Sequence, residues 1–222
     1  MTKTVLFATA AVLALSVGGV ASAAKPVSVS LHHAKAHSLK GADRSAGILY
    51  DQSSNDSGIG IVSQNFESSF DIYDAAAADD FTVPKGSKWK VTEVDAFGVY
   101  FNGSGPARDE NVTFYKDNHG SVGAQVATVT SAGTDSFGSF TISLGKKGVK
   151  LKKGTYWVSV QANLDFSAGG EWGWENQSTV EGTAAVWQNP GDGFATGCTT
   201  WTTETTCIPD GQGDHMFTLR GK

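Results

Sequence analysis

The chain has 222 residues, a net charge of −5 and 27 glycines, and only 18% of its residues are charged. The negative balance argues against a nucleic-acid-binding surface. Abundant glycine with few charges is typical of short strands joined by tight turns rather than of long helices. The length suits one domain with a core of its own.

Residues 1–23 have the features of a secretory signal peptide. Lys3 supplies the positive start, and the apolar stretch from Val5 to Val17 is short for a membrane span. Ala21-Ser22-Ala23 gives a small-residue cleavage site. We therefore expect a secreted, extracellular protein whose mature form has no membrane span. Residues 24–47 are basic and lack a regular period, so we expect a flexible basic linker before the domain.

From residue 48 to residue 222, alternating or apolar stretches separated by turn residues indicate strands. The stretch Trp89–Phe101 changes its alternation near Thr92-Glu93, which predicts a β-bulge or a crossing between sheets. With no amphipathic helix, the pattern favours an all-β antiparallel sandwich of jelly-roll-like topology. The expected strands are Ile48–Tyr50, Ile59–Val62, Asp79–Val83, Trp89–Phe101, Val112–Tyr115, Val126–Thr130, Phe137–Leu144, Lys150–Asn163, Ala184–Gln188 and a closing strand with Phe217 and Leu219.

Several motifs occur in order along this region: AADDFTVPKGSKW, GVYFNGSGPA, NVTFYKD, GTYWVSVQAN, EWGWEN and VWQNPGDGFATGCTTW. Together they resemble an uncharacterised β-sandwich domain found in many secreted bacterial proteins. The resemblance covers Ile48 to Lys222 and implies secretion and a sandwich fold. It implies no chemistry, because this type of domain has no assigned activity.

The two cysteines, Cys198 and Cys207, predict one disulfide, since an exported chain meets an oxidising compartment. The eight residues between them are enough for a hairpin that brings the sulfurs together. We expect the bridge to place Trp201 beside Trp187 and the loop from Gly191 to Gly197.

Tryptophan is concentrated between Tyr156 and Cys207. Large rings there are expected to fill the core, and we expect this for most of them. The alternative is a carbohydrate platform, because indole faces stack on sugars while nearby amides bind hydroxyls. The partner would be an extracellular glycan or a cell-surface component. The candidate residues for such a platform are Trp157, Gln161, Asn163, Trp172, Trp174 and Asn176.

Acidic residues in or beside turns suggest a structural calcium site. Calcium takes several oxygen ligands, often from loops distant in sequence. The candidate ligands are Asp51, Asp79, Asp80 and Asp192. The alternative, which we favour, is that these carboxylates cap turns and keep the surface soluble.

Catalytic signatures are weak. Glu93 and Asp95 match the start of the E-x-D-x-x-E pattern of retaining jelly-roll glycosidases, but Gly98 stands where the last carboxylate should be. No G-x-S-x-G nucleophile elbow is present. The sequence therefore favours a non-enzymatic binding or surface-interaction module. A purely structural extracellular protein is the alternative, and a divergent glycoside hydrolase is the third.

Overall fold

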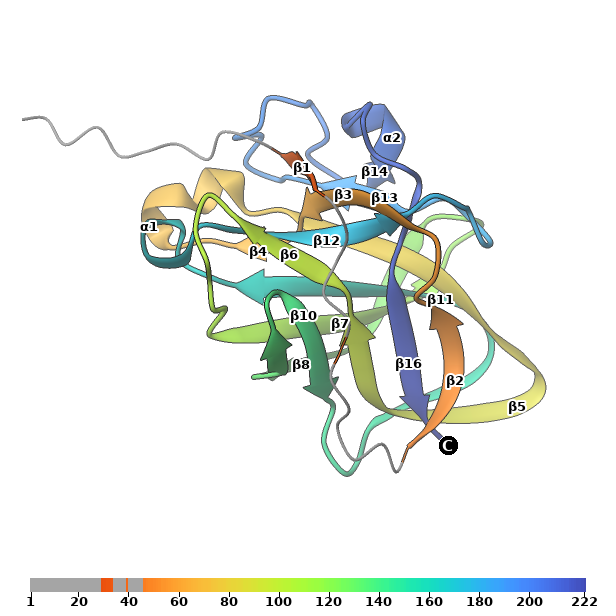
Figure 1. Cartoon of the computed structure of the whole chain (residues 1–222). Helices are drawn as coiled ribbons and strands as arrows, with labels where there is room; N and C mark the ends of the chain where they lie inside the picture. Colours follow the sequence, from red (N-terminus) through yellow and green to blue (C-terminus); the bar gives the residue numbers. More distant parts are fainter. Residues whose placement is uncertain (1–28, 34–38, 40–45) are drawn as a thin grey trace, which may run out of the picture.

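The computed structural model describes residues 29–33, 39 and 46–222, and in these the chain forms two mostly antiparallel β-sheets packed as a sandwich (Figure 1). The all-β sandwich expected from the sequence is confirmed, whereas the strand order does not establish a jelly-roll topology. The predicted signal peptide and most of the predicted linker lie outside the described residues.

The smaller sheet has the order β1-β3-β12-β15, with β6 also paired to β12. Its central strand, β12, is flanked on both sides and buried along its whole length. All pairings in this sheet are antiparallel. Its strands are β1 (Ser30–His32), β3 (Asp56–Val62), β6 (Gly98–Phe101), β12 (Glu171–Gln177) and β15 (Asp214–His215).

The larger sheet runs β14-β13-β5-β11-β7-β8, with β10, β16, β2, β4 and β9 attached beside this path. The one parallel pairing among the described strands is that of β4 with β11. Its strands are β2 (Gly47–Gln52), β4 (Gln64–Asn65), β5 (Ala76–Ala96), β7 (Asp109–Asp117), β8 (Val122–Ser131), β9 (Thr134–Ser136), β10 (Ser139–Ser143), β11 (Val149–Asn163), β13 (Val186–Gln188), β14 (Thr202–Thr203) and β16 (Phe217–Gly221).

Strand β5 shows how the sequence pattern maps onto the sheet. The sequence predicts two strands here, separated by Pro84-Lys85-Gly86. The structure has one long strand instead, and these three residues lie in a bulge of it. Val83 pairs with Gly154 of β11, and the next residue of β5 that pairs with β11 is Lys88. A second bulge of β5 lies at Thr92, which has no paired residue in β16 although Val91 and Glu93 on either side of it do. This confirms the bulge predicted near Thr92-Glu93. The chain crosses to the other sheet later, between β5 and β6.

The largest side chains in the core between the sheets are aromatic rings, packed among aliphatic residues. Trp172, Trp174 and Trp187 are fully buried in the main cluster, and Trp157 is fully buried in a smaller one. Each of the three indoles of the main cluster donates its N–H to a backbone carbonyl, as a buried indole must to avoid an unpaired donor. The expectation that most tryptophans fill the core is confirmed.

Strand β1 corrects the expectation that residues 24–47 are only a linker. Ser30 to His32 pair in antiparallel register with Ile61 to Ile59 of β3, and Leu31 packs against the core. The signal was too short to detect, since three residues carry almost no periodicity. Among the residues that the structure describes, the remaining elements are one short 3-10 helix, η1 (Ser68–Tyr73), and two single-turn helices, α1 (Phe166–Gly169) and α2 (Glu204–Cys207). None of the helices in the described residues is long and apolar enough to cross a membrane.

Candidate functional site

The outer face of β11, β7 and β8 carries two of the amide side chains that the sequence singled out, Gln161 and Asn163. Along β11, Val158, Val160 and Ala162 point into the core, so the alternate residues point away from it. The alternate residues of β7 lie beside them, and those of β8 complete the face. The paired positions are Trp157 with Tyr115, Ser159 with Thr113, Gln161 with Asn111, Asn163 with Asp109, Thr113 with Thr128, and Asn111 with Thr130. We call this surface the amide face.

Amide groups form a connected row that runs from the middle of the amide face to the end at Asp109. Asn163 accepts hydrogen bonds at Oδ1 from Asn65 (2.9 Å) and Asn111 (3.0 Å), and it donates to Asp109 (2.5 Å). Asn111 also accepts from the Thr130 hydroxyl at 2.7 Å. These bonds fix the orientation of the side chains. Asn111 donates its second N–H to Gln161 at 3.4 Å. One N–H of Asn163 and one oxygen lone pair of Asn111 therefore remain for further hydrogen bonds; Asn163 is only 4% exposed, whereas Asn111 is half-buried.

One end of the amide face is bordered by aromatic rings. Trp157 itself is fully buried there, beneath Ala78 and Val186, so it offers no surface to a ligand. The half-buried rings of Tyr115 and Trp201 pack edge to face, with centroids 5.9 Å apart. Burial raises the pKa of Tyr115, so its hydroxyl stays protonated near neutral pH and can donate a hydrogen bond.

The other end of the amide face opens into a hollow of about 360 Å³. Asn163 lines it, together with Arg108 and Asp165. Partial burial raises the pKa of Asp109 at this end, but the donors of Arg108 and Asn163 outweigh that effect and lower the pKa overall. From Tyr115 to Asp109 the face spans about 20 Å, because a strand rises about 3.3 Å per residue.

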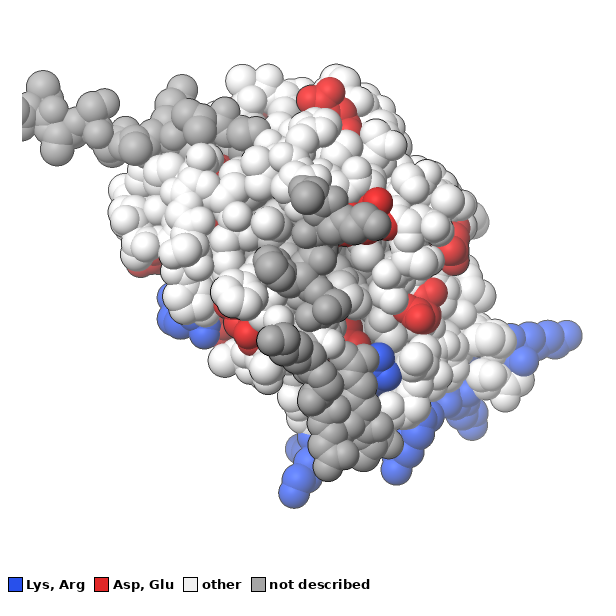
Figure 2. All heavy atoms as spheres, viewed as in Figure 1, with Lys and Arg blue, Asp and Glu red and all other residues white. Residues whose placement is uncertain are grey.

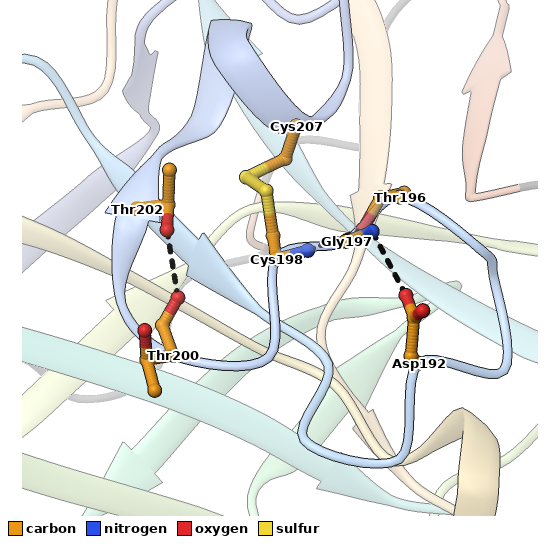
Figure 3. Close-up of a disulfide and its surroundings, with 7 residues drawn as sticks. All are labelled: Asp192, Thr196, Gly197, Cys198, Thr200, Thr202 and Cys207. Carbon is orange, nitrogen blue, oxygen red and sulfur yellow. Dashed lines mark hydrogen bonds between the residues drawn. A yellow bond between two sulfur atoms is a disulfide. The ribbon is translucent and has the colours of Figure 1, made fainter.

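The disulfide Cys198–Cys207 is confirmed, with the two Cα atoms 5.9 Å apart (Figure 3). It closes the short segment that carries Trp201. The segment that carries Trp201 lies beside Trp187 as expected, since Thr202 pairs with Trp187, but the Trp201 ring packs on Tyr115 and the Trp187 ring packs on Phe194. The bridge therefore constrains a ring at the edge of the amide face.

Removal of the bridge by Cys198→Ser with Cys207→Ser is expected to leave a folded β protein. A loop of about ten residues contributes roughly 2.5–3 kcal/mol in the chain-entropy model, which corresponds to a melting temperature about 5–10 °C lower. Thermal unfolding followed by circular dichroism measures the change. An unfolded double variant at room temperature, or one with an unchanged melting temperature, would contradict this role.

The second predicted platform is wrong. Trp172 and Trp174 are two apart on β12 as expected, but their shared face points into the core, where Trp172 contacts Phe140 and Trp174 stacks on His215 at 4.4 Å. Asn176 is also buried, and its amide bonds the backbone of Asp214. The physical reason is that β12 has a neighbouring strand on both edges and is covered on both faces.

The four aspartates proposed as calcium ligands do not come together. Asp51 accepts hydrogen bonds from Ser53 and Thr218, and Asp192 accepts one from the Gly197 backbone in the disulfide loop (Figure 3). Both carboxylates therefore stabilise the local backbone, as predicted by the alternative in which the aspartates cap turns. Within residues 29–33, 39 and 46–222, no three His, Cys, Asp or Glu side chains are arranged to hold a metal ion.

Asp79 and Asp80 lie instead in a buried acidic cluster with Asp214. Asp79 accepts from Gln52 (2.6 Å) and from the His215 backbone (2.7 Å). Burial raises the pKa of Asp80 to about 6 and of Asp214 to about 7, and it raises that of Asp79 strongly, with Asp214 adding to the effect. Asp214 is a single acidic residue at the start of a short strand, so no sequence signal marked it.

The partial glycosidase motif has a structural role. The Arg220 guanidinium lies 2.8 Å from Asp95 and 3.7 Å from Glu93, so the two carboxylates share one cation. At Gly98, a Cβ atom would collide with the Trp172 ring, which leaves no room for a third carboxylate at that position.

Comparisons of the chain with protein-family models, with curated proteins and with solved structures found no match. The resemblance to secreted bacterial sandwich domains therefore stays a prediction, and the function must be argued from the geometry.

Proposed function

We propose that this protein is an exported, non-enzymatic carbohydrate-binding module and that the amide face is its binding surface. Export rests on the predicted signal peptide. The binding surface includes Gln161 and Asn163, which the sequence indicated, and Asn111, Tyr115 and Trp201, which it did not.

The observation that carries the proposal is the connected row of amides beside two half-buried rings. Sugar hydroxyls both donate and accept hydrogen bonds, and so do amides and threonine hydroxyls. Because Asn163 and Asn111 already hold each other in place, little side-chain freedom would be lost on binding. The rings of Tyr115 and Trp201 supply the apolar contact that a sugar face requires.

The centre of the face favours a neutral glycan. The groups there are amides and hydroxyls, from Asn111, Gln161 and Thr128. Charged groups lie at the far end, where Arg108 and Asp109 pair with each other at 3.0 Å. A length of about 20 Å suits several consecutive sugar units rather than a single one.

A panel of neutral oligosaccharides from glucan, xylan, mannan and chitin tests this proposal by isothermal titration calorimetry. We expect binding by at least one of them and a loss of about tenfold or more in affinity for Asn111→Ala and for Trp201→Ala, because each substitution removes a contact at the centre or edge of the face. Both variants should remain folded, since neither side chain is in the main core.

Gln212→Ala is the matched control, because it removes an exposed amide next to β15 and outside the amide face. Its affinity should equal that of the unaltered protein. If no oligosaccharide binds, or if Gln212→Ala weakens binding as much as Asn111→Ala, the amide face is not a glycan site, and the structural role becomes the better account.

A further inference from the structure

Lysines gather along one edge of the sandwich, at the end where β5 bulges, β11 begins and the chain terminates (Figure 2). All but three of the lysines and arginines that the structure describes belong to this group; the exceptions are Arg108, Lys116 and Arg220. We call the group the lysine edge. Its members are Lys85, Lys88, Lys90, Lys146, Lys147, Lys150, Lys152, Lys153 and Lys222.

The fold places these positive charges directly opposite one another. Lys88 pairs with Lys152 across the strands, and Lys90 pairs with Lys150. Like charges at directly opposed positions of a sheet repel and destabilise it. Within the described part of the chain, none of these lysines forms an ion pair with Asp or Glu. An anionic partner would therefore relieve a repulsion that the folded protein leaves uncompensated.

The lysine edge also contains a hollow of about 640 Å³ between β8 and the loop before β11. Lys90, Lys146, Lys147 and Lys150 line it. Its remaining surface is mostly aliphatic, from Val126, Ala127, Val129 and Val149. The hollow thus combines ammonium groups with an apolar wall. A ligand that fits would carry negative charges on a body with apolar faces.

We propose that the lysine edge binds an acidic polysaccharide, a chain of sugars that carry carboxylates. Sugar rings have apolar faces for the aliphatic wall, and the carboxylates would pair with the lysines that line the hollow. The site differs from the amide face, because Lys150 and Asn163 stand near opposite ends of β11, and the β8 residues that line the hollow, Ala127 and Val129, alternate with the amide-face residues of that strand. The proposal therefore does not depend on the proposed function.

Two other polyanions fit less well. Single-stranded nucleic acid is held largely by bases stacked on aromatic rings, but the hollow has no aromatic residue in its lining, and nearby Trp89 is stacked on Phe81. A lipid bilayer is planar and is entered by protruding apolar side chains, whereas the apolar residues here line a recess. A glycan chain can follow such a recess, so the acidic polysaccharide is the better match.

The test is a titration with oligogalacturonate, in which every sugar carries a carboxylate, against its fully methyl-esterified form. We expect the acid form to bind at low ionic strength, to weaken as salt is added because salt screens exposed charges, and to outcompete the ester by at least about tenfold. The double variant Lys147→Gln/Lys150→Gln should lose at least about tenfold in affinity.

The control is Lys116→Gln, which removes a positive charge from outside both the lysine edge and the amide face. It should change affinity by less than about twofold, and thermal unfolding should show both variants folded. Absence of oligogalacturonate binding, an equal loss in Lys116→Gln and in the double variant, or equal binding of the ester would overturn the proposal. Tighter binding of duplex DNA or of phosphatidylglycerol vesicles with the same lysine dependence would also overturn it.

Discussion

Trp174→Ala is expected to lower the free energy of unfolding by about 3–5 kcal/mol, the range found when a buried tryptophan is truncated. Trp174 is fully buried, its indole donates to the Met216 carbonyl at 2.9 Å, and its ring stacks on His215. Truncation would leave a cavity in the core and remove one of the two hydrogen bonds that the Met216 carbonyl accepts, the other being from the Phe97 N–H. Urea unfolding measures this loss, and we expect the slope of the free energy of unfolding against urea concentration to stay unchanged.

Trp201→Ala provides the contrast, because the Trp201 ring is half-buried at the edge of the small cluster. It should cost much less stability than Trp174→Ala while weakening glycan binding. A loss below about 1 kcal/mol for Trp174→Ala would contradict the placement of this ring in the core.

Stability is expected to fall as the pH rises from about 4.5 to about 8, opposite to the behaviour of a protein with salt-bridged carboxylates. Burial raises the pKa of Glu110 and of Glu171 from 4.5 to about 7, and hydrogen bonds from Gly133 and Asn102 offset only part of this. Burial, followed by the charge of Asp56, raises the pKa of Glu175 to about 9.

The sign follows from proton uptake. These carboxyls hold their protons more tightly in the folded chain than in the unfolded chain. Their contribution to the free energy of unfolding is therefore complete below the unfolded pKa near 4.5, and it is lost as the pH rises through the folded pKa values. For Glu171 alone the shift corresponds to about 3 kcal/mol, and the melting temperature should fall by about 10 °C over this range.

Thermal unfolding at pH values from 4.5 to 8 measures this dependence. Glu171→Gln should raise the melting temperature at pH 8 and reduce its fall, because glutamine cannot ionise. Glu67→Gln is the matched control: burial raises the pKa of Glu67, but bonds from the Ser167 and Phe166 backbones lower it overall, so this variant should not reduce the fall. A melting temperature that is constant or increases with pH would contradict the burial of these carboxyls.

Alternation along the chain was informative where one face of a strand meets the core and the other does not. In β11 it separated Val158 and Val160 from Gln161 and Asn163 correctly, because the first pair is in the core and the second lies on the outer face. In β12 the same reasoning failed. Both faces of that strand are covered, so the spacing of Trp172 and Trp174 could not distinguish a core from a platform.

Features that depend on pairing between strands could not be read from the sequence. Asn111 appears in the motif NVTFYKD as an ordinary strand residue, and its role follows from its register opposite Gln161. The lysine edge arises in the same way: Lys88 and Lys152 are distant in sequence, and the pairing of β5 with β11 places them opposite each other. Local pattern thus predicted elements and faces, while sites required the register.

The central claim is that the amide face binds a neutral glycan, and side-chain amide resonances test it most directly. In an isotope-labelled sample titrated with the oligosaccharide selected from the panel, the account predicts that the N–H signals of the half-buried amides of Asn111 and Gln161 shift together and saturate with one affinity. The buried amides of Gln64 and Asn189, which bond backbone carbonyls in the interior, should not move. Shifts confined to other residues, or none at saturating sugar, would contradict the claim.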